Sequence, residues 1–174
     1  MTDVLTPEQR RLNMSRVRGK DTKPEMLLRK GLHARGLRYR LHPKDVPGKP
    51  DLVFPRYRAV ILVHGCFWHG HNCPLFKWPA TRPEFWRKKI EGNRARDART
   101  LEELQAAGWR TLVIWECALR GPGRRQVSEV LGFCDRFIHG AANSAATLAS
   151  ASSTKLYDRT AHQITLDEVD PIAT

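Results

Sequence analysis

Two short apolar runs constrain the fold of this chain more than any other feature. Residues 58–64, RAVILVH, and residues 111–117, TLVIWEC, are rich in β-branched and aliphatic side chains. Each run has the length of a strand that is buried on both faces. Between them lies a long basic segment, 83–107, with apolar residues at helical spacing and Gly108 at its end. Two buried strands joined through a helix predict an α/β fold in which helices pack on a sheet.

Several shorter segments complete the predicted order. Capping-box patterns at 22–25 and 81–84 each open a helix, the first ending at Gly36 and the second spanning 83–107. Alternation over 37–42 and the run 51–54 predict two further strands. A last helix is expected near 125–138. The resulting order, α-β-β-β-α-β-α, describes a mixed β-sheet flanked by helices.

The two ends of the chain differ from its middle. Residues 1–20 are basic and carry few apolar groups, so we expect an N-terminal arm that is either flexible or a short helix. Residues 140–174 are rich in Ala, Ser and Thr without an apolar period, which predicts a mostly disordered tail. The folded domain is then 21–139. A membrane span and a signal peptide are not expected, so we predict a cytoplasmic protein with reduced thiols.

The charge of the chain points to a polyanionic partner. Lys and Arg number 30 against 18 Asp and Glu, which gives a net charge of +12. The excess is clustered, since Arg10 to Lys44 holds twelve basic residues and only two acidic ones, and a second basic group follows Arg82. A basic surface also aids solubility, but clustering favours nucleic acid as the partner.

Asp51 is the first candidate metal ligand. It opens the strand 51–54, and a turn centred near Tyr57 would place it across from Val63. A carboxylate at that point can hold a hard cation, with the main-chain carbonyl of Val63 as a second oxygen ligand. The alternative is that Asp51 only ends the loop 46–50.

Asp97 and Glu25 are further candidate acids. Asp97 lies on the apolar stripe of the 83–107 helix, where an unpaired carboxylate would cost several kcal/mol. It therefore needs a cation or a histidine, unless Arg94 satisfies it or the helix turns it to the edge. Glu25 has the place of the acid in a capping box, which alone could explain it, but it also lies above Leu28 and Leu32 toward the core.

The loop after the first apolar run, HGCFWHGHNC, is dense in metal-binding residues. Cys66, His71 and Cys73, with Cys117 at the end of the second run, provide one nitrogen and three sulfur ligands. That is a closed tetrahedral zinc set, and a loop this irregular needs such a constraint. The alternative is that these are free thiols. Cys134, among apolar residues of the last helix, is expected to be inert core.

The same loop leaves two histidines and several aromatic side chains over. A neutral His64 or His69 beside a metal-bound carboxylate suits a general base that activates water, with Asp97 to orient it. Phe67 and Trp68, and Trp86 in the basic helix, can stack on or wedge between bases, or can simply pack the loop. Met14 in the basic arm has the same two interpretations.

Taken together, six segments resemble the Vsr mismatch endonucleases, over roughly residues 10–138. The combination of HGCFWH with WECALR is highly specific. The matching segments are Asn13-Met14-Ser15, Asp21-Thr22, Pro47-Gly48-Lys49-Pro50-Asp51, His64-Gly65-Cys66-Phe67-Trp68-His69, Ala80-Thr81-Arg82 with Phe85-Trp86, and Trp115-Glu116-Cys117-Ala118-Leu119-Arg120.

The resemblance implies a restriction-endonuclease-like core and a set of roles. It implies Asp51 as the principal Mg²⁺ ligand, His69 as the base, Glu25 and His64 ordering metal-bound waters, and Asp97 in support. Structural zinc would be held by Cys66, His71, Cys73 and Cys117. Phe67, Trp68 and Trp86 would intercalate next to the mismatch, with Met14 on its other side. The second acid and lysine usual in this fold are missing at Val63-His64-Gly65, a departure typical of the Vsr branch. Gly70 and Asn72 replace histidines of some relatives, which argues against ligand roles there.

The implied activity is nicking of duplex DNA 5′ of the thymine in a T:G mismatch left by deamination of 5-methylcytosine. We expect a monomer that is nucleoid-associated when bound to DNA, with mismatch-repair proteins as a further partner. Two rivals stay open. One is a restriction-type or structure-specific endonuclease without a mismatch requirement, and the other is a zinc-stapled DNA-binding module without catalysis.

Overall fold

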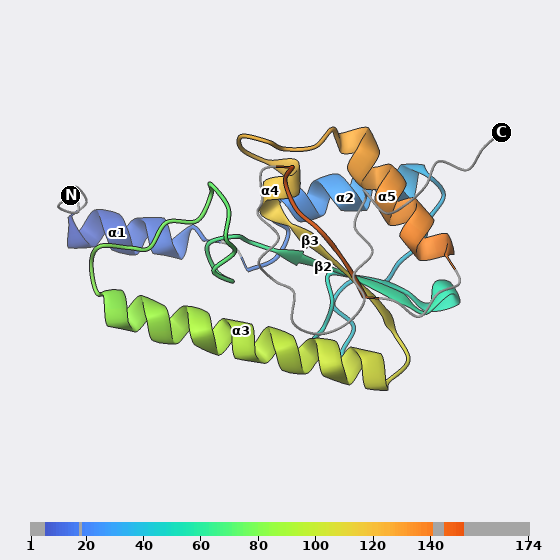
Figure 1. The fold of residues 1–174 in the computed structure, drawn as a ribbon, viewed down its shortest axis with the longest axis horizontal. Coiled ribbons are helices and arrows are strands. Elements are labelled where there is room, and N and C mark those ends of the chain that lie inside the picture. The colour runs from blue at the N-terminus through green and yellow to red at the C-terminus, as the bar shows by residue number, and fades with distance from the viewer. Residues whose placement is uncertain (1–5, 18, 141–144, 152–174) are drawn as a thin grey trace.

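The computed structural model describes residues 6–17, 19–140 and 145–151 as a four-stranded sheet between two layers of helices (Figure 1). The strands lie in the order β1-β2-β3-β4, with β1 antiparallel to β2 and the other two pairs parallel. The predicted mixed sheet with flanking helices is therefore confirmed. The elements are α1 (Pro7–Ser15), α2 (Lys23–Ala34), β1 (Leu52–Phe54), the 3₁₀ turn η1 (Pro55–Tyr57), β2 (Ala59–His64), α3 (Pro83–Ala106), β3 (Arg110–Trp115), α4 (Glu116–Leu119), α5 (Val127–His139) and β4 (Ala145–Leu148).

Alternation along β2 divides the core between the two faces of the sheet. Ala59 and Ile61 pack with α2 and α5, while Val60 and Leu62 pack with Leu104 of α3. Figure 1 shows α3 below the sheet and α2 with α5 above it. Because both faces are covered, β2 and β3 consist almost entirely of buried residues, as their apolar sequences predicted.

The helix starts follow the predicted signals only in part. Thr22 caps α2, and its hydroxyl accepts from the amide of Glu25, which is one half of the predicted capping box. The carboxylate of Glu25 accepts from the amide of Asp21 instead of that of Thr22. The capping box predicted at 81–84 is wrong. Arg82 is the N-cap residue of α3, in a left-handed conformation and without a side-chain capping bond. Pro83 in the first turn and Gly108 after the last mark the ends of this 24-residue helix.

Three sequence-based assignments need correction. The strand expected over 37–42 is a single antiparallel bridge between Arg40 and Val53. The strand expected to reach Cys117 ends at Trp115, and α4 begins at Glu116. Within the tail assigned to 140–174, residues 145–148 form β4, paired with β3 from Thr111 to Ile114. The arm expected over 1–20 contains α1, whose start is closed by a capping box between Thr6 and Gln9.

None of the helices in the described ranges combines the length and the apolar content that crossing a bilayer demands.

Candidate active site and metal centre

One pocket of about 450 Å³ lies where β2 ends, between α2 and α3. Its lining includes all five side chains that the sequence analysis considered for catalysis: Glu25, Asp51, His64, His69 and Asp97. Residues more than 70 positions apart in the chain thus meet in one cavity. Val17, Gly19 and Trp68 also line it, so the arm and the aromatic loop both reach the pocket.

Asp51 lies deep in the pocket at the start of β1. Its Oδ2 atom accepts a hydrogen bond of 2.7 Å from the main-chain amide of Val63. Burial raises the pKa of Asp51 to about 6, against the lowering effect of that bond, and the negative charge of Glu25 adds to the rise. The register differs from the predicted one, because Leu52 pairs with Ile61, which places Asp51 opposite Leu62. The contact with Val63 is therefore to its amide, and a role for its carbonyl stays a prediction.

Glu25 is buried beside Asp51 and is held by several donors. Its carboxylate accepts from the hydroxyl of Thr22, the amide of Asp21 and the guanidinium of Arg29. A capping role and a place in the pocket therefore hold for the same residue. The two interpretations of Glu25 were not exclusive.

His42 belongs to this group, and the sequence analysis missed it. Its Nδ1 atom lies 3.7 Å from Oδ1 of Asp51, and its Nε2 atom lies 3.0 Å from the guanidinium of Arg29. The main-chain amide of His42 donates to the carbonyl of Pro50, which brings the ring beside Asp51. No motif or spacing signals this contact, since it depends on how the segment 40–42 folds back on 50–53.

His64 and His69 stack in the pocket, with their ring centroids 4.1 Å apart and their planes at 3°. Burial, together with the neighbouring His69, lowers the pKa of His64 to about 4, so His64 is neutral at pH 7. Nδ1 of His69 donates to the carboxylate of Asp97. The expected partner of Asp97 is therefore a histidine, whereas Arg94 donates to the carbonyls of His69 and Gly70 instead.

The acidic end of the pocket fits a hard divalent cation. Carboxylate oxygens of Glu25 and Asp51 lie within 4.8 Å of each other, and a ring nitrogen of His42 lies within the same distance of both. Carboxylate oxygens are the ligands that Mg²⁺ prefers. A buried carboxylate whose ionisation burial opposes also gains more from a cation than an exposed one does.

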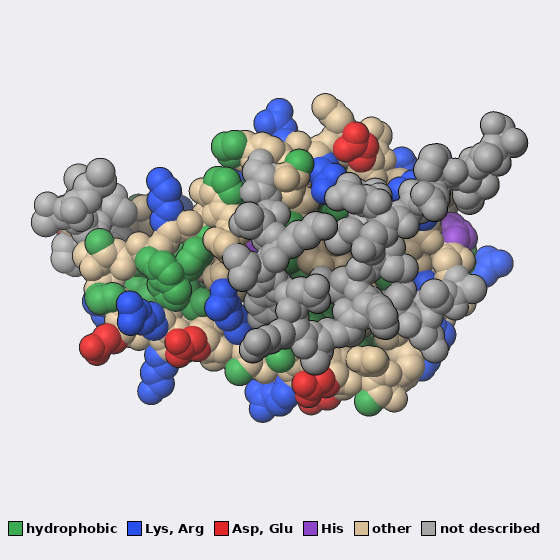
Figure 2. Space-filling model, in the orientation of Figure 1, with side chains coloured by type: hydrophobic (Ala, Val, Ile, Leu, Met, Phe, Trp, Pro, Cys, Tyr) green, Lys and Arg blue, Asp and Glu red, His purple; other side chains and the backbone are tan. Residues whose placement is uncertain are grey.

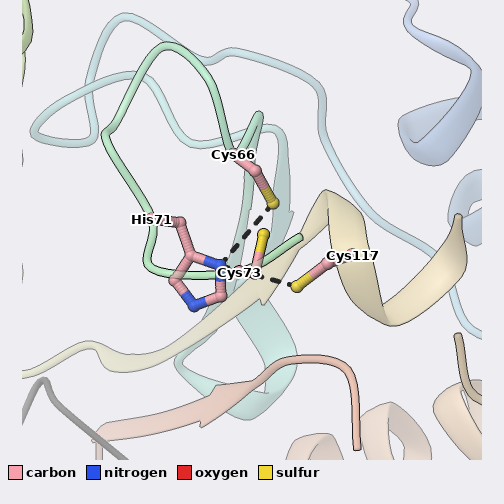
Figure 3. Close-up of side chains that lie close together, drawn as sticks. All are labelled: Cys66, His71, Cys73 and Cys117. Carbon is pink, nitrogen blue, oxygen red and sulfur yellow. Dashed lines mark hydrogen bonds between the residues drawn. The ribbon is translucent and has the colours of Figure 1, made fainter. Parts of the chain in front are cut away.

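A second cluster of ligands lies behind the pocket, where the loop after β2 meets the start of α4. The side chains of Cys66, His71, Cys73 and Cys117 point toward one another (Figure 3). Nδ1 of His71 is 3.7 Å from Sγ of Cys66 and 3.5 Å from Sγ of Cys117. Tetrahedral zinc with ordinary bond lengths separates a sulfur and a nitrogen ligand by about 3.6 Å. The four residues therefore fit a closed metal site.

The pKa values of the cysteines in the cluster also favour a bound cation. Hydrogen bonding from Cys66 lowers the pKa of Cys117 to about 3, while the pKa of Cys66 is raised by that same bond and by burial. One thiolate forms at the expense of the next, so a cation is what would let all the sulfurs ionise together. Cys134 differs, since burial in the apolar core raises its pKa to about 12, as expected for inert core.

An aromatic cluster adjoins the pocket. The rings of Phe67, Trp68 and Trp86 contact one another with centroids 5.1 to 6.1 Å apart, and all three are half-buried. The cluster is larger than the sequence analysis predicted, because Phe76 packs on Phe67 and Trp78 on Phe76. The sequence signal that could have found Trp78 is its position between the basic residues Lys77 and Arg82.

The loop after β2, which carries Phe67 and Trp68, lies at the end of the molecule where α1 and the first half of α3 extend past the sheet (Figure 1). Figure 2 shows hydrophobic side chains gathered at this end, with Lys and Arg beside them and some Asp or Glu side chains nearby. Met14 of α1 is 45% exposed, and Leu12, Val17, Trp78 and Phe85 are also large exposed apolar residues. An apolar surface bordered by cations suits a partner with flat rings and phosphates.

Comparison with known proteins assigns this arrangement to a family. A family model described as DNA mismatch endonuclease Vsr matches residues 2–75. The DNA mismatch endonuclease Vsr of Escherichia coli (strain K12) is 50% identical over 121 residues, which cover 70% of this chain and 78% of that protein. The chain belongs to the Vsr family of DNA mismatch endonucleases.

Other Vsr relatives are named as nicking enzymes. The type II nicking enzyme V.XorIIP of Xanthomonas oryzae pv. oryzae is 54% identical over 71% of this chain and 90% of its own length. The type II nicking enzyme V.NmeAIP of Neisseria meningitidis is 42% identical over 69% of this chain and 86% of its own length. This Vsr-family protein is therefore an endonuclease that acts on DNA, with the restriction-endonuclease-like sheet that the resemblance implied.

Proposed function

We propose that this Vsr-family endonuclease nicks duplex DNA 5′ of the thymine in a T:G mismatch that arises from deamination of 5-methylcytosine. The observation that carries the proposal is the meeting of Glu25, Asp51, His64, His69 and Asp97 in one pocket beside the aromatic cluster. Nicking at this point starts very short patch repair. The proposed cofactors are a catalytic Mg²⁺ at Asp51 and a structural Zn²⁺ at Cys66, His71, Cys73 and Cys117.

Recognition begins with phosphate contacts from the basic arm and α3. Phe67, Trp68 and Trp86 then enter the base stack next to the mismatch, with Met14 approaching from the other side. Unstacking a base step costs a few kcal/mol, and the cost is smallest where pairing is already poor. Insertion of these rings therefore favours mismatched DNA without a specific contact to every base.

The pocket supplies the acid-base groups for hydrolysis. A bound Mg²⁺ would polarise the scissile phosphate and lower the pKa of an attacking water. Because Asp97 accepts from Nδ1 of His69, Nε2 of that ring carries the lone pair that takes a proton from the water. The water oxygen bonds to phosphorus and the bond from phosphorus to the 3′ oxygen breaks. The released 3′ oxygen takes a proton from a second water, which leaves a 3′-hydroxyl and a 5′-phosphate.

The other pocket residues hold this arrangement. Neutral His64 stacks on His69 and fixes the plane of its ring without adding a charge. Glu25 accepts hydrogen bonds on both oxygens and presents a fixed negative charge beside Asp51, where it would order water around a cation.

A nicking assay on a panel of duplexes tests the proposal. We expect Mg²⁺-dependent cleavage of T:G duplexes, at least tenfold slower cleavage of matched T:A duplexes, and variation with flanking sequence. Equal cleavage of matched and mismatched DNA would support a restriction-type nuclease instead, a rival favoured by the relatives named as nicking enzymes.

Asp51→Ala is expected to stop cleavage while zinc content and mismatch binding persist. Normal cleavage by Asp51→Ala would show that the metal is held elsewhere.

Asp97→Asn is predicted to slow nicking by about 10- to 100-fold at saturating DNA, since the amide cannot hold the Nδ1–H tautomer of His69 as a carboxylate does. Single-turnover rates measure the effect. DNA affinity and zinc content should stay unchanged. A matched control is Glu102→Gln, an exposed acid on the same helix. If both variants nick at the rate of the unaltered protein, His69 needs no orienting partner.

A further inference from the structure

The residues behind Asp51 form a chain of contacts that the proposed reaction does not yet use. Arg29 is buried, with 5% of its surface exposed. It donates to Asp21 through one guanidinium nitrogen and to Glu25 through the other, the second bond being 2.9 Å long. The nitrogen that binds Glu25 also lies 3.0 Å from Nε2 of His42. The chain then continues from the ring of His42 to Asp51.

This contact fixes the hydrogen positions on the imidazole of His42. A guanidinium has only donors, so the Nε2 atom that faces it must be the acceptor. The ring hydrogen then lies on Nδ1, and Nδ1 is the atom 3.7 Å from Oδ1 of Asp51. His42 lies near Glu25 and Asp51 as a third group of a metal-ligand set, but with its Nε2 lone pair engaged and its Nδ1 protonated it cannot ligate a metal.

We propose that His42, locked by Arg29, is a positioning residue that aims an N–H group at the metal-binding carboxylate of Asp51. The Val63 amide holds Oδ2 of that carboxylate by a hydrogen bond, and Nδ1 of His42 faces Oδ1 across an electrostatic contact of 3.7 Å, so a rotation of the carboxylate loses both interactions. Each oxygen keeps its remaining lone pairs for a cation. Groups that orient a ligand in this way contribute about 10- to 100-fold to metal affinity.

The backbone supports the same assignment. His42 has a φ of 43°, in the left-handed region that is uncommon for residues other than glycine, although histidine enters it more often than most. Its amide bond to the carbonyl of Pro50 holds this conformation and sets the ring against Asp51. Backbone strain at a residue that contacts a candidate metal ligand is consistent with a positioning role.

Two variants separate positioning from packing. His42→Asn keeps an N–H group at the place of Nδ1 and tolerates the left-handed backbone, whereas His42→Leu fills similar space without a donor. The inference rests on the proposed Mg²⁺ site, so Mn²⁺ is used as the probe in calorimetry on zinc-loaded protein without DNA. His42→Leu should bind Mn²⁺ about tenfold or more weakly. His42→Asn should stay close to the unaltered protein. His33→Leu, an exposed histidine on α2, is the matched control.

A second measurement does not depend on any metal. Nitrogen chemical shifts of the imidazole in ¹⁵N-labelled protein should show His42 protonated at Nδ1 and unprotonated at Nε2. A ring protonated at Nε2, or equal Mn²⁺ affinity in the leucine variant, overturns the inference. Failure of the proposed metal site has a different signature, because Asp51→Ala would then bind Mn²⁺ as well as the unaltered protein does. Thermal unfolding without Mn²⁺ checks that the leucine variant is folded.

Discussion

Asp51→Asn is expected to abolish nicking and, in the same protein, to raise the stability of the metal-free fold. Loss of the carboxylate removes the proposed anchor for Mg²⁺, and Lewis-acid stabilisation worth several kcal/mol corresponds to a rate loss of about 10³-fold or more. The amide can still accept the Val63 hydrogen bond. What disappears is the cost of a buried charge.

The size and the sign of the stability change follow from the pKa of Asp51. Burial raises that pKa from 3.8 to about 6, so the folded protein binds a proton that the unfolded chain has already lost. The contribution of Asp51 to stability is therefore highest below pH 4 and is lost as the pH rises through about 6. Above pH 7 the asparagine variant should be more stable by up to about 3 kcal/mol, because each tenfold change in an acid dissociation constant is worth about 1.4 kcal/mol.

Urea unfolding of both proteins between pH 4 and pH 8, in chelator that removes Mg²⁺ but spares zinc, measures this difference. His64 contributes with the opposite sign, because its lowered pKa makes stability rise over the same range. That contribution is common to the two proteins and cancels when their free energies of unfolding are subtracted. Saturating Mg²⁺ should narrow the gap by stabilising only the aspartate form. A difference that does not change with pH would contradict the assignment of a buried, destabilising carboxylate.

Removal of the proposed zinc from the cysteine cluster is the second change expected to have a large effect. Structural zinc sites of this ligand type bind with apparent free energies of about 10–16 kcal/mol, whereas a whole domain is stable by about 5–15 kcal/mol. The cluster joins the loop after β2 to the start of α4, and the ring of His71 stacks on Trp115. Without the ion, the loop that carries Phe67, Trp68 and His69 loses its attachment, so nicking should cease.

Cys117→Ala is the test variant, and Cys134→Ala is its matched control. Both thiols are buried, but Cys134 lies in the apolar core away from the cluster. We expect zinc content near zero and a loss of several kcal/mol in stability for the first variant. The second should keep one zinc per chain and lose only about 1 kcal/mol through the small cavity. Chelated protein should recover activity with Zn²⁺ and not with Mg²⁺ alone. Full activity of the Cys117 variant would contradict a structural role for the ion.

Local sequence patterns predicted the parts of this fold that depend on local physics. The apolar runs that became β2 and β3 and the helical period of α3 are properties of neighbouring residues. Asp97 could be found for the same reason, because a carboxylate on an apolar helical stripe needs a partner wherever the helix lies. The pairing of that carboxylate with His69 then followed from the small number of candidates.

The features that were not predicted depend either on contacts between distant segments or on segments whose side chains are only weakly apolar. His42 reaches Asp51 only because a left-handed residue turns the chain beside Pro50. The segment AATL has small, weakly apolar side chains and resembles part of a disordered stretch, yet it forms β4 because the edge of β3 offers unpaired main-chain groups. Most of the predicted tail, from 152 onward, lies outside the described residues.

The strand β4 attaches the segment after residue 144 to the sheet and to the cysteine cluster. Beyond it, the amide of Ser150 donates to Sγ of Cys117, and Arg125 donates to the carbonyl of Ala149. Composition alone suggests residue 140 as the place to truncate the protein. Such a truncation would remove β4 and expose the edge of β3. It would also remove the hydrogen bond that the amide of Ser150 donates to Sγ of Cys117, one of the proposed zinc ligands. A segment that looks like a disordered tail in the sequence thus contributes to the fold. Its removal is expected to lower both the solubility of the protein and its retention of the proposed zinc.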